Sequence, residues 1–332
     1  MSGVIFFLVL IILYFSLNIF INDRSSRHSN KFIEKIIHRT FLHKIFKATK
    51  QGWIITSFTS SKTIDKLSNL DVKKNKWFTI SNEENSGVAD PFLFKKQEIY
   101  YLFFEYEYHK SLNKGADIAY AISNDGLNWD YKSKILQEKF HQSFPYVFEQ
   151  DNEVYMLPES YQSNEVRLYK AVGFPNNWTL DAILHDGNEF ADTIFLEKES
   201  VFYWFTTNLE TDELLLFYSN GFKEKWIEHP KSPISKSIHN NRNAGAILLE
   251  NNKIYRVAQD GSKGYGSGIN LYEINNLTKD SFKEVKIKAP LFFKTEGKFK
   301  DAIHHLSIIR EENFDIIAID GANFGVKNIT IK

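Results

Sequence analysis

Short apolar and aromatic runs recur along this chain, and the polar residues at their ends are the ones that could do chemistry. Asp90 opens one run that closes with Glu105, Glu159 closes the next run, and Asp192 opens the third. A pair of carboxylates can cleave a glycosidic bond, because an ionised one acts as base or nucleophile and one with a raised pKa acts as acid. Asp90, Glu159 and Asp192 are therefore candidate catalytic residues for chemistry on a carbohydrate.

Other polar or aromatic residues near the ends of the runs are candidate substrate-binding residues. They are Glu105, His141, Arg242, Gln259, Asp260, Tyr265, Asp301, His304 and His305. A guanidinium such as that of Arg242 can clamp a carboxylate or a phosphate. Aromatic side chains that could stack on sugar faces are Phe104, Tyr106, Tyr146, Tyr161 and Tyr265. The alternative is structural, since acidic residues at strand ends also bind backbone amides and hold neighbouring elements together.

Several other kinds of site are not supported. The chain has no Cys, no G-x-S-x-G, no Walker A motif and no H-E-x-x-H. Gly261–Gly268 (GSKGYGSG) is rich in glycine but lacks the strand-to-helix context of a phosphate-binding loop, so we expect a flexible loop. Adjacent residues on a strand point to opposite faces, so His304 and His305 should not ligate one ion. We predict no metal site and no cofactor.

The elements that position these residues form five copies of one pattern: a short strand, a polar turn and an aromatic-rich strand. The copies are Ala89–Glu105, Ser143–Ser160, Ala191–Thr207, Asn243–Asp260 and His304–Asp320. In each copy one residue stands ten positions before an aromatic residue. These pairs are Asp90 and Tyr100, Pro145 and Tyr155, Asp192 and Phe202, Gly245 and Tyr255, and His304 and Phe314.

The repeat predicts an all-β, five-bladed β-propeller over residues 75–332. A further strand and turn follow each of the first four copies and end in an aromatic residue, at Trp129, Trp178, Trp226 and Phe282. Each unit thus supplies about four strands in roughly 50 residues, the size of a propeller blade. We expect the segment around Trp77–Ile80 to complete the fifth blade. The alternative is a generic β-sandwich with coincidental spacing.

The blade hairpins predict where the polar residues meet. A hairpin returns the chain to the end from which it started, so the start of its first strand and the end of its second share one rim. We therefore expect the candidate residues of all five blades to converge on one mouth of the ring.

The N-terminus predicts a transmembrane anchor over residues 1–22. Val4–Ile21 is an uncharged run of 18 residues, just long enough to cross about 30 Å of hydrocarbon. A signal peptide is the alternative, but no basic residue precedes the run and no A-x-A pattern follows it.

Residues 23–74 form a basic connector, with an excess of six positive charges between residues 23 and 50. The positive-inside rule then places the propeller of this single-pass protein on the cytoplasmic side. Apolar residues at helical spacing from Ile33 to Ile45 predict a basic amphipathic helix. It either lies on the membrane lipid or packs on the domain.

Composition narrows the remaining classes. The chain has 332 residues, with 41 Lys and Arg against 41 Asp and Glu, and this neutrality argues against a nucleic-acid partner. Because the connector is basic, the propeller is net acidic. The 29 Phe, 16 Tyr and 6 Trp suit packed sheets, and much of this aromatic surplus stands at repeating blade positions.

Two motifs resemble known families. Ala89–Phe92 (ADPF), with the YLFFE strand and Ser123–Trp129 (SNDGLNW), resembles family 43-type glycoside hydrolases, which are five-bladed propellers. Phe140–Ser160 is similar to the N-terminal domain of plant glucosamine inositolphosphorylceramide transferases. The segments LYKAVGFPNNW, AQDGSKGYG and Asp301–His305 fit this family too, and the resemblance covers about residues 75 to 325.

The resemblance to family 43 implies roles for individual residues. Asp90 matches the general base, and Asp192 matches a position that tunes a pKa or orients the substrate. The acid of that family is normally a Glu that opens the fourth blade, but here Asn243, Ala244 and Gly245 occupy this place. Glu159 could supply the acid from another blade.

Three functions remain open. The first is a carbohydrate-active enzyme, glycosidase-like or glycosyl-transferring, in the biosynthesis or modification of cell-surface glycans or glycolipids. The second is a non-catalytic glycan-binding module that positions substrate for partner glycosyltransferases. The third is a structural interaction propeller, which would have an apolar rim. A cytoplasmic orientation favours biosynthesis over degradation.

Overall fold

The computed structural model describes residues 46–50, 52–69, 77–80, 85–108, 115–287, 291–293, 301–322 and 326–331. The predicted membrane anchor and the predicted amphipathic helix lie outside these ranges. Among the described residues, none of the helices has the length and apolar character needed to span a membrane. The chain divides into two compact units, one covering Trp53–Ala322 and the other made from the two ends of the chain. In the second unit, β1 (Phe46–Lys50) pairs antiparallel with β23 (Val326–Ile331).

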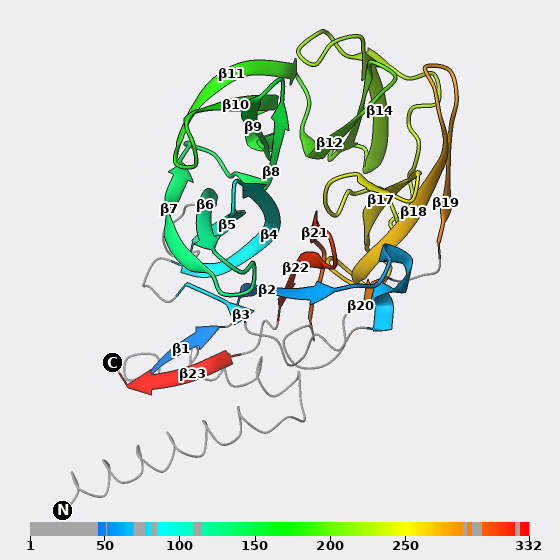
Figure 1. Cartoon of the computed structure of the whole chain (residues 1–332). Coiled ribbons are helices and arrows are strands. Elements are labelled where there is room, and N and C mark those ends of the chain that lie inside the picture. The colour runs from blue at the N-terminus through cyan, green and yellow to red at the C-terminus, as the bar shows by residue number, and fades with distance from the viewer. Residues whose placement is uncertain are drawn as a thin grey trace, which may run out of the picture. The chain divides into compact units, whose positions relative to one another are not determined.

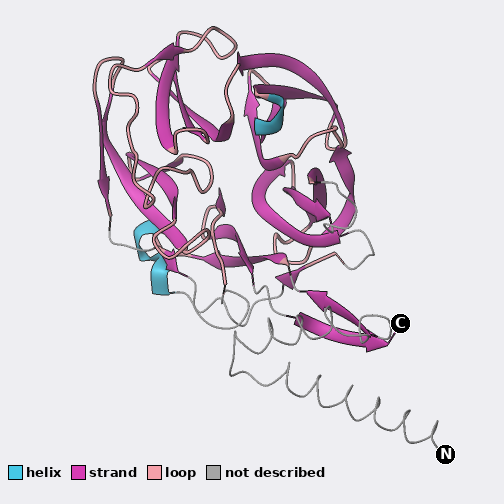
Figure 2. Ribbon diagram, turned by 180° about the vertical axis from the view of Figure 1, so that it is seen from behind, coloured by secondary structure: helices cyan, strands magenta, loops and turns pink. Residues whose placement is uncertain are grey.

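The unit Trp53–Ala322 consists of five antiparallel sheets arranged in a ring (Figures 1 and 2). The first blade contains β4 (Asn85–Lys96), β5 (Ile99–Tyr108), β6 (Ala116–Ser123) and β7 (Asp130–Leu136). The second contains β8 (Ser143–Gln150), β9 (Glu153–Glu159), β10 (Glu165–Gly173) and β11 (Asn177–Asp186). The third contains β12 (Phe190–Lys198), β13 (Val201–Asn208), β14 (Glu213–Ser219) and β15 (Ile227–Glu228). These sheets confirm the predicted all-β, five-bladed propeller.

The fourth and fifth blades complete the ring. The fourth contains β16 (Leu248–Glu250), β17 (Lys253–Asp260), β18 (Gly268–Leu277) and β19 (Phe282–Lys286), with β20 (Phe292–Phe293) paired to β18. The fifth contains β21 (Leu306–Arg310), β22 (Asp315–Ala322), β2 (Trp53–Ser60) and β3 (Trp77–Phe78). Two short 3-10 helices, Ile64–Asn69 and Tyr161–Ser163, lie between strands.

Both ends of the propeller sequence contribute to the fifth blade. As expected, β3 is its outer strand. Its third strand is β2, which comes from the stretch 23–74 that the sequence assigns to a connector. β2 pairs with β22 along its whole length, from Trp53 opposite Ala322 to Ser60 opposite Asp315. The ladder between β2 and β22 therefore closes the ring.

The hairpin pairings correct the ten-residue register by one position in the second blade. Counting six residues back from the last paired residue of the first strand gives Asp90 and Asp192 in blades one and three, but Phe144 in blade two. The backbone agrees, because these three residues have φ of 50°, 51° and 46°. The predicted Pro145 is thus one residue late. The first blade has two consecutive aromatic residues, Tyr100 and Tyr101, so the spacing alone leaves this ambiguity.

The same count shifts the predicted position in the fourth blade by one residue. It also shows that the aromatic residue predicted for the fifth blade is wrong. In the fourth blade the equivalent position is Ala244, not Gly245. In the fifth it is His304, as predicted, but the loop between Arg310 and Asp315 is two residues longer than in the other hairpins. Phe314 lies in this loop with 41% of its surface exposed, so it is not a packed blade aromatic.

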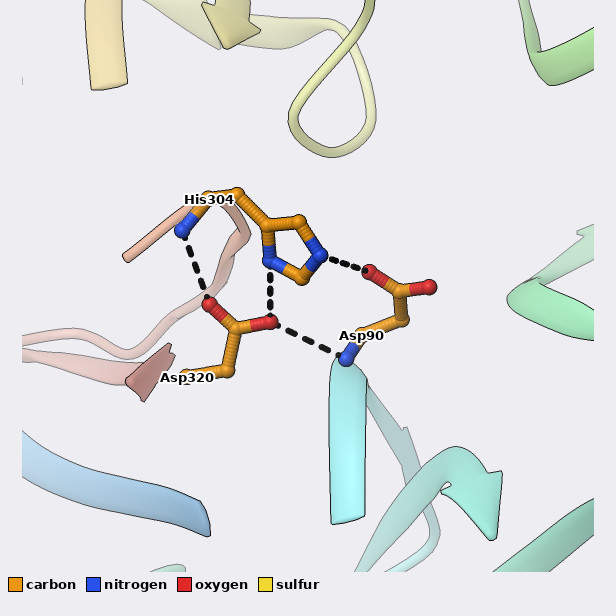
Figure 3. A group of neighbouring side chains, drawn as sticks. All are labelled: Asp90, His304 and Asp320. Atoms are coloured by element: carbon orange, nitrogen blue, oxygen red, sulfur yellow. Dashed lines mark hydrogen bonds and ion pairs between the residues drawn. The ribbon is translucent and has the colours of Figure 1, made fainter. Parts of the chain in front are cut away.

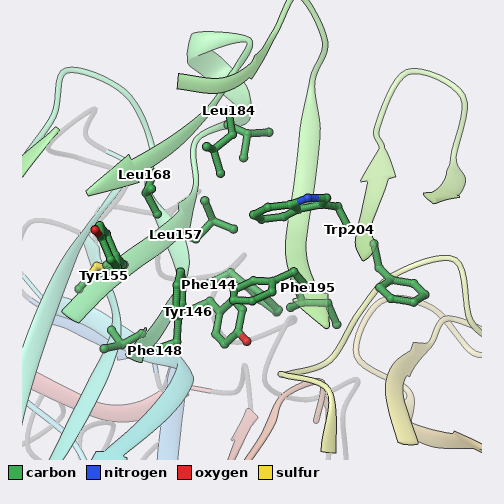
Figure 4. Close-up of a cluster of buried hydrophobic side chains, with 14 of the residues drawn as sticks. Phe144, Tyr146, Phe148, Tyr155, Leu157, Leu168, Leu184, Phe195 and Trp204 are labelled. Carbon is green, nitrogen blue, oxygen red and sulfur yellow. The ribbon is translucent and has the colours of Figure 1, made fainter. Parts of the chain in front are cut away.

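Aromatic side chains fill the spaces between blades. Figure 4 shows such a cluster, in which Phe144, Tyr146 and Phe195 come from the second and third blades. Trp204 is fully buried, and its ring stacks on Trp226 with centroids 4.7 Å apart. This confirms that much of the aromatic surplus is packing. Three of the aromatic residues predicted to stack on sugars are instead buried in the core: Phe104, Tyr106 and Tyr146.

We expect Ile55→Ala to destabilise the whole propeller. Ile55 is fully buried in β2 and packs in a cluster with residues of the first and fifth blades. Its truncation should lower the free energy of unfolding by about 2–5 kcal/mol in chemical denaturation. Thr59→Ala, at an exposed position of the same strand, is the matched control and should change it by less than about 0.5 kcal/mol. Equal effects of both variants would contradict the placement of β2.

Candidate functional site

In the first and third blades, a β-bulge in the first strand orients a candidate catalytic aspartate. The ladder between β4 and β5 shifts between Ala89 and Phe92, and that between β12 and β13 shifts between Ala191 and Ile194. Asp90 and Asp192 lie in these bulges with positive φ, a conformation that aspartate tolerates better than most residues. Bulges of this kind redirect a side chain out of the regular alternation.

Asp90 meets His304 and Asp320 from the fifth blade (Figure 3). Its Oδ1 lies 3.7 Å from Nε2 of His304, and Nδ1 of His304 lies 2.6 Å from Oδ2 of Asp320. Its Oδ2 accepts a hydrogen bond from the backbone N–H of Phe144 at 3.1 Å. The three side chains thus form a buried acid–imidazole–acid chain. Asp320 was not among the predicted site residues.

His305 also reaches Asp90, which corrects the expectation that adjacent histidines point apart. Its Nδ1 lies 3.5 Å from the same Oδ1 that faces His304. The expectation assumed regular strand geometry, but β21 begins only at Leu306, and residues 301–305 have no strand alternation. Both imidazoles can therefore turn toward one carboxylate.

Among the described residues, Asp90, His304 and Asp320 have ligand atoms close enough together to hold a metal ion. Their hydrogen bonding does not suit this role. Both oxygens of Asp320 already accept donors: the backbone N–H groups of His304 and His305 on Oδ1, and the backbone N–H of Asp90 on Oδ2. An ion at this trio would have to displace these donors.

A second network joins the second, third and fourth blades through Arg242. Its Nε donates to Oδ2 of Asp192 at 2.7 Å, and its Nη2 donates to Oε2 of Glu159 at 3.3 Å. Gln259 donates to the same oxygen of Asp192 at 3.3 Å. The guanidinium lies 5.9 Å from the ring of Tyr265, whose surface is 58% exposed.

The two networks favour opposite protonation states of Asp90 and Glu159. Burial raises the pKa of Asp90, but the charge of His304 and the hydrogen bonds of His305 and Phe144 outweigh it, so this pKa lies well below its usual range. Burial raises the pKa of Glu159 to about 8; the charges of Asp192 and Asp90 add to this, and Arg242 opposes it. At neutral pH Asp90 is therefore ionised and Glu159 is protonated, and the charge of Asp90 helps to raise the pKa of Glu159.

Glu105 and His141 extend the cluster around Asp90. Nε2 of His141 lies 3.6 Å from Oε1 of Glu105. Burial, then the neighbouring carboxylates, hold the pKa of Glu105 well above its ordinary value, while burial lowers the pKa of His141. Burial thus favours the uncharged form of both groups. Charge interactions link Glu105 to Asp90, Glu159 and Asp320, so polar side chains from all five blades lie within electrostatic range of one another.

Two other predicted residues contact neighbouring loop and strand residues. Asp260 is buried, but it pairs with His239 at 3.1 Å and accepts the N–H of Ser262, so it stabilises the loop that follows β17. Asp301 is half-buried, and its backbone N–H bonds the carbonyl of Ala322.

Two residues that sequence reasoning missed support the site. Trp53 stacks on the face of the His304 ring with centroids 4.1 Å apart, and Asp320 contacts Nδ1 at the edge of the same ring. A signal for Asp320 exists in the sequence: it closes the fifth copy of the repeat, as Glu105 closes the first. No comparable signal marks Trp53, because its contact depends on the closure of the ring.

The fourth blade has no room for a side chain at Gly245, which stands close to the place of the family 43 acid. Gly245 has φ of 144°, and a Cβ built on it would lie 2.0 Å from the carbonyl oxygen of Leu306. The adjacent backbone N–H of Leu306 bonds the carbonyl of Ala244. The fifth blade thus occupies the space that a glutamate at this residue would need.

A ring of five antiparallel blades around a buried carboxylate cluster defines the class: a five-bladed propeller of the kind found in glycoside hydrolases. The fold is similar to that of the alpha-L-arabinofuranosidase PaAbf62A from Podospora anserina, with a TM-score of 0.54 and 11% identity over 73% of this chain and 93% of that one. The catalytic domain of the Coprinopsis cinerea GH62 alpha-L-arabinofuranosidase gives the same values. At this identity the likeness shows the fold alone.

The sequence identifies the family. The model for glucosamine inositolphosphorylceramide transferase 1, N-terminal, matches residues 72–324, so the chain belongs to this family, as the motifs indicate. It is 35% identical over 220 residues to glucosamine inositolphosphorylceramide transferase 1 of Oryza sativa subsp. japonica, covering 64% of this chain and 29% of that protein. It is 31% identical over 257 residues to the Arabidopsis thaliana protein, covering 74% and 32%. The chain therefore matches about a third of the length of these relatives.

We expect Glu159→Gln to remove a pH-dependent destabilisation. The pKa of Glu159 is raised from 4.5 to about 8 by folding, so its contribution to stability is complete below pH 4.5 and is lost as pH rises through 8. Glutamine mimics the protonated acid. The melting temperature of the variant relative to the parent should therefore increase between pH 5 and pH 9 in thermal unfolding.

Asp192→Asn is the contrasting variant for this measurement. It weakens the bond to Arg242 and should lower the melting temperature across the same pH range. A pH-independent difference for Glu159→Gln would contradict the assignment of Glu159 as the protonated acid.

Proposed function

We propose that this propeller is a carbohydrate-active enzyme that acts on a glycosidic bond in the biosynthesis or modification of a cell-surface glycan or glycolipid. One observation carries the proposal: an ionised Asp90 and a protonated Glu159 lie in one buried cluster at neutral pH. Such a pair is what general base and general acid catalysis at an acetal requires. The names of the relatives, which are transferases of an inositolphosphorylceramide, favour a glycolipid substrate.

In this proposal Asp90 acts as base on a water or hydroxyl nucleophile, and Glu159 donates its proton to the leaving oxygen. Arg242 pairs with Asp192 and opposes the protonation of Glu159, but burial and the charge of Asp192 outweigh this effect and keep Glu159 protonated. Tyr265, whose exposed ring lies next to Arg242 and His304, offers a surface on which a sugar ring can stack. Both hydrolysis and transfer to another hydroxyl are compatible with these roles.

A second candidate, a non-catalytic glycan-binding module that positions substrate for partner glycosyltransferases, is favoured by a specific contact. Arg242 binds both Glu159 and Asp192, which restrains the proposed acid. The match to about a third of the relatives' length is compatible with a module that works beside a catalytic domain.

We further propose that the N-terminal segment anchors the propeller to a membrane and that the propeller faces the cytoplasm. Support comes from the uncharged run Val4–Ile21 and the basic residues that follow it. This orientation would place the site on the side where nucleotide-linked and lipid-linked sugars are assembled.

We expect Asp90→Asn to lower turnover without loss of substrate binding. The full chain in detergent is screened with nucleotide sugars, oligosaccharides and glycosylated inositolphosphoceramides. On an active substrate, kcat should fall by about 10²–10⁴ because the base is lost, while binding by calorimetry persists. Asp315→Asn, at the far end of β22, is the control with unchanged kcat. Saturable binding without turnover by the parent protein would instead establish the binding module.

The pH profile of the same reaction tests the acid. kcat/KM should decline as pH rises through about 8, because Glu159 then loses the proton that it must donate. Glu159→Gln should lack activity across the whole range. A profile that stays flat to pH 10 would show that another group supplies the proton.

A topology reporter tests the orientation. Alkaline phosphatase and green fluorescent protein are fused separately to the C-terminus in a bacterial host. A cytoplasmic propeller gives fluorescence without phosphatase activity. The opposite pattern would reverse the orientation and remove the argument that it makes for biosynthesis.

A further inference from the structure

Asp320 is a fully buried acid with no chemical step assigned to it in the proposed function. Its Oδ1 accepts hydrogen bonds from the backbone N–H groups of His304 and His305, both at 3.0 Å. Its Oδ2 accepts the backbone N–H of Asp90 at 3.2 Å and lies 2.6 Å from Nδ1 of His304. One carboxylate therefore ties the start of the first blade to the start of the fifth.

Contacts on several sides restrict the imidazole of His304 to one orientation. Trp53 stacks on its face at 4.1 Å, and Tyr265 packs edge-on at 5.1 Å. With Nδ1 held by Asp320, the other nitrogen, Nε2, points at Oδ1 of Asp90, as Figure 3 shows. A rotated ring would lose the contact with Asp320 and the contact with Asp90 together.

We infer that Asp320 is a positioning residue for the candidate base: it orients His304 through Nδ1 and holds the backbone of Asp90, so that Nε2 of His304 faces the Asp90 carboxylate. The inference rests on the proposed function for the role of Asp90 as base. The arrangement itself can be tested without any substrate.

The electrostatics agree with this arrangement. Burial lowers the pKa of His304, but the charge and hydrogen bond of Asp320 outweigh it and raise this pKa to about 9. His304 is then charged at neutral pH, and its charge lowers the pKa of Asp90. Other titratable groups that act on Asp90 or His304 are His305, His141, Glu105, Glu159, Asp192 and Tyr265.

The test is Asp320→Asn in the full chain, with the titration of His304 followed by NMR. The amide oxygen can still accept backbone N–H groups, but the side chain no longer carries a charge beside Nδ1. We expect the pKa of His304 to fall by about one unit or more, because the neutral amide no longer stabilises the charged imidazole. Asp315→Asn makes the same chemical change in the same strand and should leave this pKa unchanged. An unchanged His304 titration in Asp320→Asn would overturn the inference.

His304→Gln is the second variant, because it keeps the backbone hydrogen bonds of Asp320 even if Asp320→Asn does not fold. In it the pKa of Asp90, measured by carboxyl NMR, should rise, and an unchanged value overturns the inference. These readouts separate the two proposals. If the titrations shift as expected but the parent protein turns over no glycan, the positioning role of Asp320 stands and the catalytic function fails.

Discussion

The pairing of β2 with β22 is the interaction on which the rest of the structure depends. In a propeller each blade covers an apolar face of its neighbour. The last blade must therefore be completed before all of these faces are buried. Here the closing strand comes from the start of the propeller sequence, and its first residue, Trp53, lies on the ring of His304. The same ladder that completes the fold therefore also builds one wall of the site, which links the stability of the ring to the geometry of Asp90.

Burying several carboxylates together is costly, and the structure offsets the cost in two different ways. Around Asp90 it supplies hydrogen-bond donors and a charged imidazole, so this acid stays ionised. Around Glu159 it supplies one guanidinium shared with Asp192, so this acid takes up a proton instead. The division follows from the number of cations available to each group, and it makes two acids of similar intrinsic strength behave oppositely at one pH.

The fold was predictable because its signal is repeated, whereas the site was predictable only in part. Five copies of a hairpin pattern identify the propeller even though two are misaligned by one residue, since the misalignment does not change the number of blades. The polar residues at hairpin ends identify Asp90, Glu159, Asp192 and Arg242. Trp53 could not be placed in this way, because its contact with His304 arises from ring closure and leaves no local pattern. Asp320 also stands at a hairpin end, but its role depends on the irregular backbone before Leu306.

The contact between Gly245 and Leu306 limits what evolution can make of this propeller. A side chain at Gly245 would collide with the carbonyl oxygen of Leu306 in the next blade, so this residue must stay a glycine as long as the contact is kept. One close approach of two backbones therefore fixes the residue type at the opening of the fourth blade, and point mutation of Gly245 alone cannot add an acid there.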